Sequence, residues 1–337
     1  MCEISKDDLK SPSKFKKKFY NYIGTIRTEI LSRYNIDFDI KEIGDLLLSI
    51  CRCNDFNVIS KKGNKMFLDD TKVREWIDRK LIPNTVIMKM DDEDVVRLLV
   101  FCLEITYQMF AGGTRATTTQ KGFRERRRTF ESILVDKFVG KLGEIFVKKF
   151  LEKNFNITTI KLDWGISTQI EKYRNDIIIA SKNISIKSSP NLTAIWAEAP
   201  KVKRKGAKRK GYDYGIMVKC SVPQHPILQF FIEVCGFSRL IDFAEKRIPS
   251  DDKLFKGYLD NIRERIKEYR CENENIQTSF KGFICGYFKT SKHYLKKEGE
   301  DLPYLGKVRE ERYLVQINEL KWTIQEWENF LKEVGLL

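Results

Sequence analysis

The chain has 337 residues, of which 42% are hydrophobic and 12% aromatic, so a protein disordered along its whole length is excluded. At roughly 150 residues per domain, the length fits two domains or one large one. Lysine and arginine outnumber aspartate and glutamate by 62 to 47, which gives a formal net charge of +15. This charge favours a polyanionic partner, and we expect nucleic acid rather than an anionic membrane surface.

The apolar residues form no membrane-spanning or secretory segment. The most apolar stretch, 95–110, contains Arg97 and Glu104, and no run reaches the about 18 apolar residues that a transmembrane helix needs. No apolar signal-peptide core follows the first residues. We therefore expect a cytoplasmic protein with no membrane partner.

The metal-binding and nucleotide-binding motifs that are easiest to find in a sequence are missing. The eight cysteines include no Cys-x-x-Cys pair, and there are only two histidines, so we expect no structural zinc site. Buried free thiols in a reducing compartment account for the cysteines. No glycine-rich phosphate loop occurs, so no nucleotide cofactor is expected.

Apolar residues recur at helical spacing through most of 1–122, which predicts a helical N-terminal region. The predicted helices cover 13–34, 37–51, 71–81 and 91–110. The third of them ends before Pro83, and the fourth ends at Gly112.

A polar break at 114–120 separates this region from a stretch of helical spacing that runs from near Phe123 to Phe155. Gly140 and Gly143 interrupt the apolar pattern of that stretch. It is therefore either a pair of joined helices or one helix with a close contact at the glycines.

Beyond residue 155 the pattern changes to β-rich runs, and the chain as a whole is predicted to be α/β. The predicted strands are 156–163, 176–180, 184–188, 212–221, 227–237, 280–288 and 313–317. A helix is predicted at 254–270, and a second follows a capping box formed by Thr323 and Glu326. We place a core domain at 123–245 and an α/β extension or recognition subdomain at 246–337.

The two strands at 176–180 and 184–188 form a hairpin with chemically distinct faces. With a two-residue loop at Lys182 and Asn183, Ile178 lies opposite Lys187 and Asp176 lies opposite Ser189. One face then collects isoleucines, and the other collects Asp176, Ser185 and Lys187. A loop of odd length would send Asp176 to the other face. Such a pair is either a surface salt bridge or part of a site.

Two further carboxylates favour a site. Glu144 lies on the predicted helix before the hairpin, and Glu198 follows Lys187 between apolar residues. Carboxylates that converge with a lysine make a hard-oxygen site suited to Mg²⁺. Mg²⁺ polarises a phosphodiester and generates hydroxide, and a desolvated lysine can steady the attacking water or the transition state.

The order of these residues resembles the PD-(D/E)xK nuclease superfamily. The resemblance covers 140–189 and rests on Gly140-Lys-Leu-Gly-Glu144, then Asn175-Asp176-Ile-Ile-Ile, then Ile184-Ser185-Ile186-Lys187. It implies a restriction-endonuclease-like mixed central sheet flanked by helices. It also implies that Asp176 binds the metal, that Lys187 is catalytic and that Glu144 is the helix acid. The implied cofactor is Mg²⁺, with Mn²⁺ able to replace it.

Ser185 stands where the superfamily pattern has its second acidic metal ligand. Some restriction enzymes of the superfamily have Ser-x-Lys at this place and take the acid from a downstream Glu, and Glu198 fits that variant. Either Glu198 or Glu144 would then be the second metal ligand. If neither reaches the metal, the site is inactive.

Two basic segments are candidates for nucleic-acid binding, with a solvated loop or helix face as the alternative for each. The first comprises Lys201, Lys203, Arg204, Lys205, Lys208, Arg209 and Lys210. The second comprises Arg124, Arg126, Arg127 and Arg128. The nearby 117–120 stretch is either a further set of phosphate or base contacts or a linker.

These observations and the resemblance lead to one functional expectation with two alternatives. We expect a Mg²⁺-dependent endonuclease that hydrolyses double-stranded DNA, most like a type II restriction enzyme and, by the resemblance, a homodimer. The helical 1–122 region would recognise DNA or dimerise. The alternatives are a structure-selective nuclease of the resolvase or repair type and a catalytically inactive DNA-binding protein.

Overall fold

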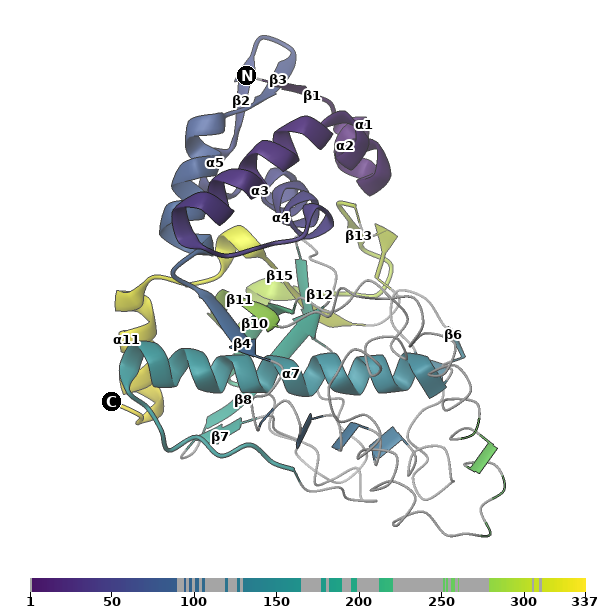
Figure 1. Cartoon of the computed structure of the whole chain (residues 1–337), viewed down its shortest axis with the longest axis vertical. Helices are drawn as coiled ribbons and strands as arrows, with labels where there is room; N and C mark the ends of the chain where they lie inside the picture. The colour runs from purple at the N-terminus through teal and green to yellow at the C-terminus, as the bar shows by residue number, and fades with distance from the viewer. Residues whose placement is uncertain are drawn as a thin grey trace. The chain divides into compact units, whose positions relative to one another are not determined.

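The computed structural model of this chain describes 2–89, 130–164, 279–304 and 311–337 without a break (Figure 1). It also describes the shorter stretches 94, 97–98, 101–102, 105–106, 119–120, 126–127, 177–179, 182–189, 195–198, 212–220, 251, 253, 256–257, 260 and 306–308. The predicted strand 227–237 and most of the predicted helices 91–110 and 254–270 lie outside these residues.

Contacts along the chain group it into two units, each built from discontinuous segments. Unit 1 contains Met1–Thr85, Ile177–Lys219 and Phe283–Leu337, and unit 2 contains Val86–Asp176 and Cys220–Gly282. The domain boundaries predicted after residues 122 and 245 both fall outside the described residues, so that division stays a prediction.

Five strands from distant parts of the chain form one mixed sheet, in the order β4-β11-β10-β8-β7. They are β4 (Thr85–Lys89), β7 (Ile177–Ile179), β8 (Lys182–Ser189), β10 (Tyr214–Cys220) and β11 (Ser279–Lys289). β8 is parallel to β10 and antiparallel to β7. Together with the helices, this sheet confirms the mixed α/β class.

The described part of the N-terminal region is mainly helical, as predicted, and small polar side chains cap most of its α-helices. It contains α1 (Lys6–Lys10), α2 (Pro12–Lys18), α3 (Tyr20–Tyr34), α4 (Ile40–Cys53), the 3₁₀ helix η1 (Asp55–Asn57), α5 (Asp70–Trp76) and the π-helix η2 (Ile77–Leu81). Ser5 and Asp39 both cap their helices with a capping box. The helix predicted at 13–34 is divided into α2 and α3 at Phe19.

The core of unit 1 joins these helices to one face of the sheet. Phe15, Ile23 and the apolar side of α4 are buried in the same cluster as Met217 of β10 and Phe283 of β11. The apolar stripes of α2 and α3 therefore pack in one core with the sheet strands that follow much later in the chain.

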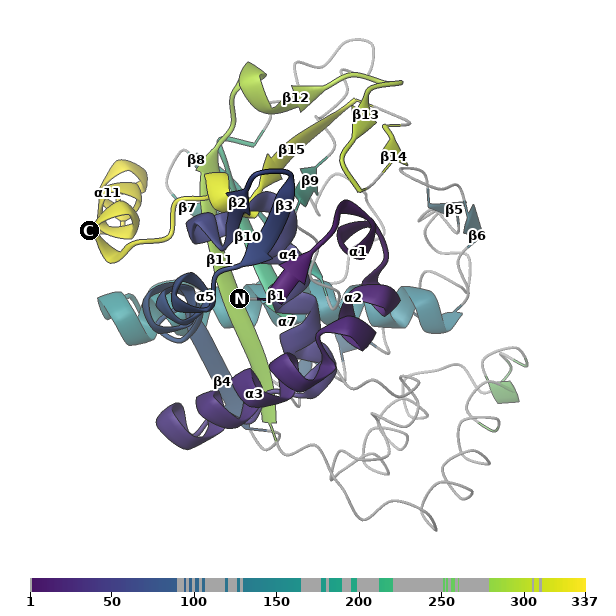
Figure 2. The ribbon, with the colours of Figure 1, turned by 90° about the horizontal axis from the view of Figure 1, so that it is seen from above.

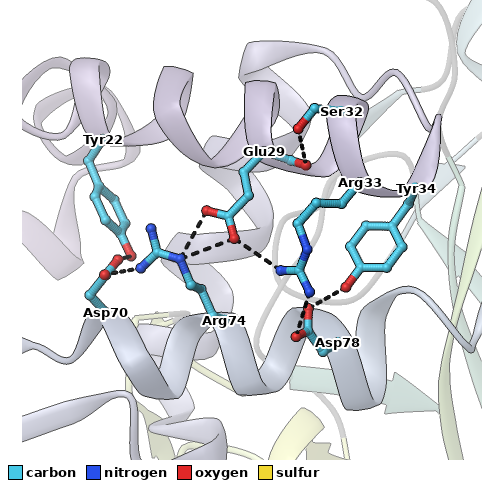
Figure 3. A network of polar contacts seen from close by, with 8 residues as sticks. All are labelled: Tyr22, Glu29, Ser32, Arg33, Tyr34, Asp70, Arg74 and Asp78. Carbon is cyan, nitrogen blue, oxygen red and sulfur yellow. Dashed lines mark hydrogen bonds and ion pairs between the residues drawn. The ribbon is translucent and has the colours of Figure 1, made fainter.

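A network of polar side chains fastens α3 to α5 and η2 (Figure 3). Arg74 pairs with Glu29 at 2.9 Å and also with Asp70. One turn along, Asp78 pairs with Arg33 at 3.0 Å and accepts a hydrogen bond from Tyr34. Burial and this hydrogen bond both raise the pKa of Tyr34, so its hydroxyl stays protonated and continues to donate.

Unit 2 contains the longest described helix, α7 (Phe130–Phe155). It is one continuous helix that begins at Phe130 rather than near Phe123, so Gly140 and Gly143 do not join two helices. Its end is marked by Asn156, which has a left-handed φ of 56°.

The predicted strand at 156–163 was wrong. The described residues there form neither strand nor helix. The Lys141 ammonium of α7 donates to the Asp163 carbonyl oxygen at 2.9 Å, so this backbone oxygen bonds to a helix side chain instead of a sheet neighbour.

The remaining strands form small sheets. β1 (Cys2–Ile4), β3 (Lys65–Leu68) and β2 (Ile59–Lys62) make one, and β12 (Leu295–Lys296), β15 (Arg312–Gln316) and β9 (Ile195–Glu198) make another. Two-stranded pairs are formed by β13 (Asp301–Leu302) with β14 (Gly306–Lys307), and by β5 (Thr119–Gln120) with β6 (Arg126–Arg127).

The C-terminal helix α11 (Ile324–Val334) has the predicted capping box. Thr323 and Glu326 each accept from the other's backbone N–H, and Gly335 ends the helix with a left-handed φ of 78°. Among the described residues, no helix has both the length and the apolar character needed to cross a membrane.

Candidate active site

The hairpin predicted around Lys187 exists, but its turn lies two residues earlier than expected. Ile178 pairs with Asn183, not with Lys187, so the register predicted from a loop at Lys182 and Asn183 was wrong. The two strands are separated by two residues, 180–181. This even spacing keeps the predicted division of faces, because Ile178 shares its face with Asn183, Ser185 and Lys187.

Asp213 explains why Lys182 and Asn183 extend the strand instead of turning. The Asn183 N–H donates to the Asp213 carboxylate at 2.8 Å, and the Asp213 N–H donates to the Asn183 carbonyl at 2.8 Å. Thr290 adds a hydrogen bond from its backbone N–H to the Asp213 carbonyl at 3.0 Å. This contact between residues far apart in sequence overrides the local turn tendency of Asn183.

The face that carries Lys187 extends from β8 onto β10. In the parallel register, Lys187 lies beside Met217, Ser185 beside Gly215 and Ser189 beside Lys219. Met217 is part of the unit 1 core, so Lys187 lies at the edge of an apolar cluster. The Lys187 side chain is half-buried there. An ammonium in such a place is partly desolvated, which strengthens its interaction with an anion.

Ser185 and Lys219 are more deeply buried than Lys187. Ser185 has no exposed surface, and Lys219 is only 5% exposed. Sequence reasoning assigned no role to Lys219, although it is the single charged residue in the run Tyr214–Cys220. The sequence does contain one signal for the position of Lys219. It lies two residues after Met217, and alternation along a strand places both residues on one face.

Glu198 ends β9, which belongs to unit 1 together with β8. β9 lies beside β15 (Figure 2) and pairs with it antiparallel. In this register Glu198 lies opposite Tyr313. β9 also contacts β8, the strand of Lys187. The backbone that carries the downstream Glu is thus held next to the strand that carries the Ser-x-Lys motif.

Glu144 lies in α7, within unit 2, and has a local partner. Its carboxylate accepts from the Lys141 ammonium at 2.5 Å, and Glu144 is 8% exposed. Lys141 also lies 5.2 Å from the ring centre of Phe101 and 5.8 Å from that of Trp164. Glu144 therefore belongs to a buried charge pair that lies beside two aromatic rings.

The remaining predicted site residues are described only in part. Arg126 and Arg127 form β6 and pair with Gln120 and Thr119 of β5, so the basic segment and the neighbouring polar stretch lie side by side. Asp176, Arg124 and Arg128 lie outside the described residues, as do Lys201, Lys203, Arg204, Lys205, Lys208, Arg209 and Lys210.

The described side chains do not by themselves make a metal site. Within the described part of the chain, no group of three or more His, Cys, Asp or Glu side chains is placed to hold a metal ion. The face of Lys187 supplies a buried hydroxyl and two ammonium groups. A hard cation such as Mg²⁺ would need carboxylate oxygens, for which Asp176 and Glu198 are the candidates.

Comparison with known proteins gave no relative. No family model matches the chain, and neither a curated protein nor a solved structure is similar to it.

Proposed function

We propose that this chain is a Mg²⁺-dependent endonuclease of the PD-(D/E)xK type that hydrolyses double-stranded DNA, most like a type II restriction enzyme. The observation that carries the proposal is that Lys187 and the buried Ser185 lie on the same face of β8. This strand is antiparallel to β7 and parallel to β10. A desolvated ammonium beside hard-oxygen ligands can stabilise the negative charge that develops on the phosphate during metal-dependent hydrolysis.

In this proposal Asp176 and Glu198 hold Mg²⁺, and Lys187 positions the attacking water and stabilises charge on the phosphate. Asp176 directly precedes β7, and the proposal requires it to continue that strand by one residue. The contact between β9 and β8 supports Glu198 as the second acid. Glu144 is the less favoured ligand, because its carboxylate already accepts from Lys141.

The net charge of +15 supports DNA as the substrate, and the even spacing between β7 and β8 supports a shared face for the catalytic groups. Cutting of both strands at one site would follow from a homodimer, with each copy cleaving one strand.

The test is incubation of the protein with long duplex DNA of mixed sequence, in Mg²⁺ and in EDTA. We expect discrete fragments that require the metal and that disappear with Lys187→Ala. The matched control is Lys182→Ala, because Lys182 lies on the same strand but on the opposite face. Equal cleavage by Lys187→Ala and the wild-type protein would refute the role of Lys187.

One observation favours a second candidate, an inactive DNA-binding protein. Ser185 occupies the position of an acidic ligand and is fully buried, so no carboxylate is supplied at this point of β8. Tight binding without cleavage of linear, branched or modified DNA in Mg²⁺ or Mn²⁺ would support this candidate. Cleavage of branched DNA alone would instead indicate a structure-selective nuclease.

A further inference from the structure

The segment from α2 into α3 is strongly basic and has no carboxylate. Residues 12–28 contain five lysines and arginines and no Asp or Glu. Three of the five have acidic partners: Lys16 pairs with Asp45 at 2.5 Å, Lys18 with Asp8 at 2.6 Å, and Arg27 with Asp37 at 2.6 Å.

The other two lysines, Lys14 and Lys17, are exposed and form no ion pair with a residue that the structure describes. They stand on a rigid support. Between them, Phe15 is fully buried, and its ring centre lies 4.7 Å from that of Phe19. The buried aromatic residues orient the helix, so that Lys14 and Lys17 lie on its exposed side.

Lys17 lines an open hollow of about 400 Å³, together with Lys18, Tyr20 and Asn21, and Lys14 lies three residues before Lys17 on the same helix. Tyr20 is 58% exposed and Asn21 is also exposed. Lysine, tyrosine and asparagine side chains are among the usual donors to phosphate oxygens. We call Lys14, Lys17, Tyr20 and Asn21 the N-terminal basic face (α2 and α3 in Figure 2).

We infer that the N-terminal basic face binds the phosphate backbone of duplex DNA. The face lies in unit 1, as does Lys187, and it is separate in sequence from both basic segments predicted earlier. The inference rests on the proposed function for its DNA partner, but it does not require cleavage.

The same observations argue against a membrane surface as the partner. A helix that lies on a membrane exposes an apolar face for insertion between lipids. Here the apolar side chains Phe15 and Phe19 are 0% and 3% exposed and belong to the core. Tyr20 is the one large hydrophobic side chain exposed between residues 12 and 28.

The test compares the affinities of two double variants for an unrelated 30-bp duplex, in EDTA and over a range of salt concentrations. The first is Lys14→Gln with Lys17→Gln. The control is Lys61→Gln with Lys62→Gln, which removes the same charge from exposed positions of β2. We expect the first to bind roughly tenfold more weakly at low salt and to lower the slope of log K against log salt by about 1.8, at about 0.9 per phosphate contact.

The control should keep the wild-type slope. If both variants lose the same DNA affinity, or if neither loses any, DNA binding by the N-terminal basic face is refuted. The proposed nuclease function is not refuted by that result, because the cleavage experiment tests it separately. Vesicles containing phosphatidylserine are the second probe. Loss of vesicle binding by the Lys14/Lys17 variant with unchanged DNA affinity would also overturn the inference, in favour of a lipid surface. A wild-type protein that binds no DNA would refute the proposed function itself.

Discussion

Lys80 and Asp55 form an ion pair in the interior of unit 1. The ammonium nitrogen lies 2.7 Å from a carboxylate oxygen, and the two side chains are 0% and 6% exposed. The same carboxylate oxygen accepts from the Trp76 indole N–H at 3.2 Å, and the ammonium also donates to the Ile317 carbonyl at 3.3 Å. The pair thus joins helices of the N-terminal region to the segment that follows β15.

Breaking this pair should be costly, because a single substitution leaves the other charge buried without its partner. We expect Asp55→Ala to lower the free energy of unfolding by about 3–5 kcal/mol. Replacing both residues, by Asp55→Leu with Lys80→Met, should recover part of that loss, although Trp76 and Ile317 remain without their partners. Urea unfolding measures both variants.

The exposed pair of Lys65 and Glu3 is the control for this comparison. Its atoms lie 3.0 Å apart, but the side chains are 63% and 52% exposed. Glu3→Ala should therefore cost only about 0–1 kcal/mol. If Asp55→Ala lowered the free energy of unfolding as little as Glu3→Ala does, burial of the pair of Asp55 and Lys80 would not contribute to stability.

Asp213 should affect both the hairpin and the proposed chemistry. Asp213→Ala removes the acceptor for the Asn183 N–H, and we expect a loss of about 1–3 kcal/mol in unfolding free energy. Because Asn183 lies on the strand of Lys187, the rate of DNA cleavage should also fall. Asp213→Asn keeps an acceptor oxygen and should retain most of both. A stable Asp213→Ala protein with unchanged activity would contradict this role.

Five cysteines should resist modification in the folded protein. Cys51, Cys53, Cys102, Cys220 and Cys285 are free and buried. Burial raises the pKa of the Cys53 and Cys285 thiols to about 12, so almost no thiolate exists at neutral pH. A thiol-specific reagent at pH 8 should leave these five unmodified until the protein is unfolded, as mass spectrometry of peptides would show. Rapid labelling of Cys285 would contradict the burial.

The C-terminal helix should lose stability in acid. Burial acts to raise the pKa of Glu326, but hydrogen bonds from Thr323 and from the Trp322 N–H outweigh it, and the pKa lies below its ordinary value of 4.5. The ion pair with Lys289 likewise lowers the pKa of Glu333. A carboxylate whose pKa is lower in the folded state stabilises that state above about pH 4.5, and this stabilisation is lost as the pH falls through the lowered pKa.

Unfolding free energy measured between pH 3 and pH 6 checks this prediction. The slope should decrease with Glu326→Gln, which cannot titrate. Glu328→Gln changes a half-buried residue of the same helix that takes no part in the capping box, and it should leave the slope unchanged. If both variants showed the same dependence of unfolding free energy on pH, the carboxylate of Glu326 would be excluded as the cause of the acid sensitivity.

Gly282 should not tolerate a side chain. A Cβ at this position of β11 would lie less than 3.0 Å from the ring of Phe146 on α7, and Phe146 is fully buried. We expect Gly282→Ala to destabilise the protein by about 1–3 kcal/mol or more. Adding Phe146→Leu should remove part of the overlap, so the double variant should lose less than the sum of the two single changes. Additive losses would show that the two sites do not interact.

Local patterns predicted those elements whose ends and faces are set by nearby residues. The capping box of α11 and the apolar stripe of α3 are of this kind. The turn of the hairpin was misplaced because Asn183 has local turn character, whereas its actual partner, Asp213, lies 30 residues away. β4 and β9 were not predicted, since short strands depend on neighbours from distant segments.

For the candidate site, alternation along β8 was sufficient to predict that Ser185 and Lys187 share a face. It could not reveal that Lys219 lies on that face, because the parallel pairing of β10 with β8 joins two separate runs of sequence. The partner of Glu144 is Lys141, three residues earlier on α7, and strand alternation carries no information about contacts along a helix.

The discontinuous make-up of unit 1 has a consequence during synthesis on the ribosome. Lys187 lies in a unit whose core also requires Phe283 and Val315, which are translated much later. Until residues 283–337 have emerged, β10 lacks most of its neighbour β11, and the core of the N-terminal helices lacks the buried side chains that β11 and β15 supply. A chain that stalls or is cleaved before this segment would therefore carry Lys187 without a folded site around it.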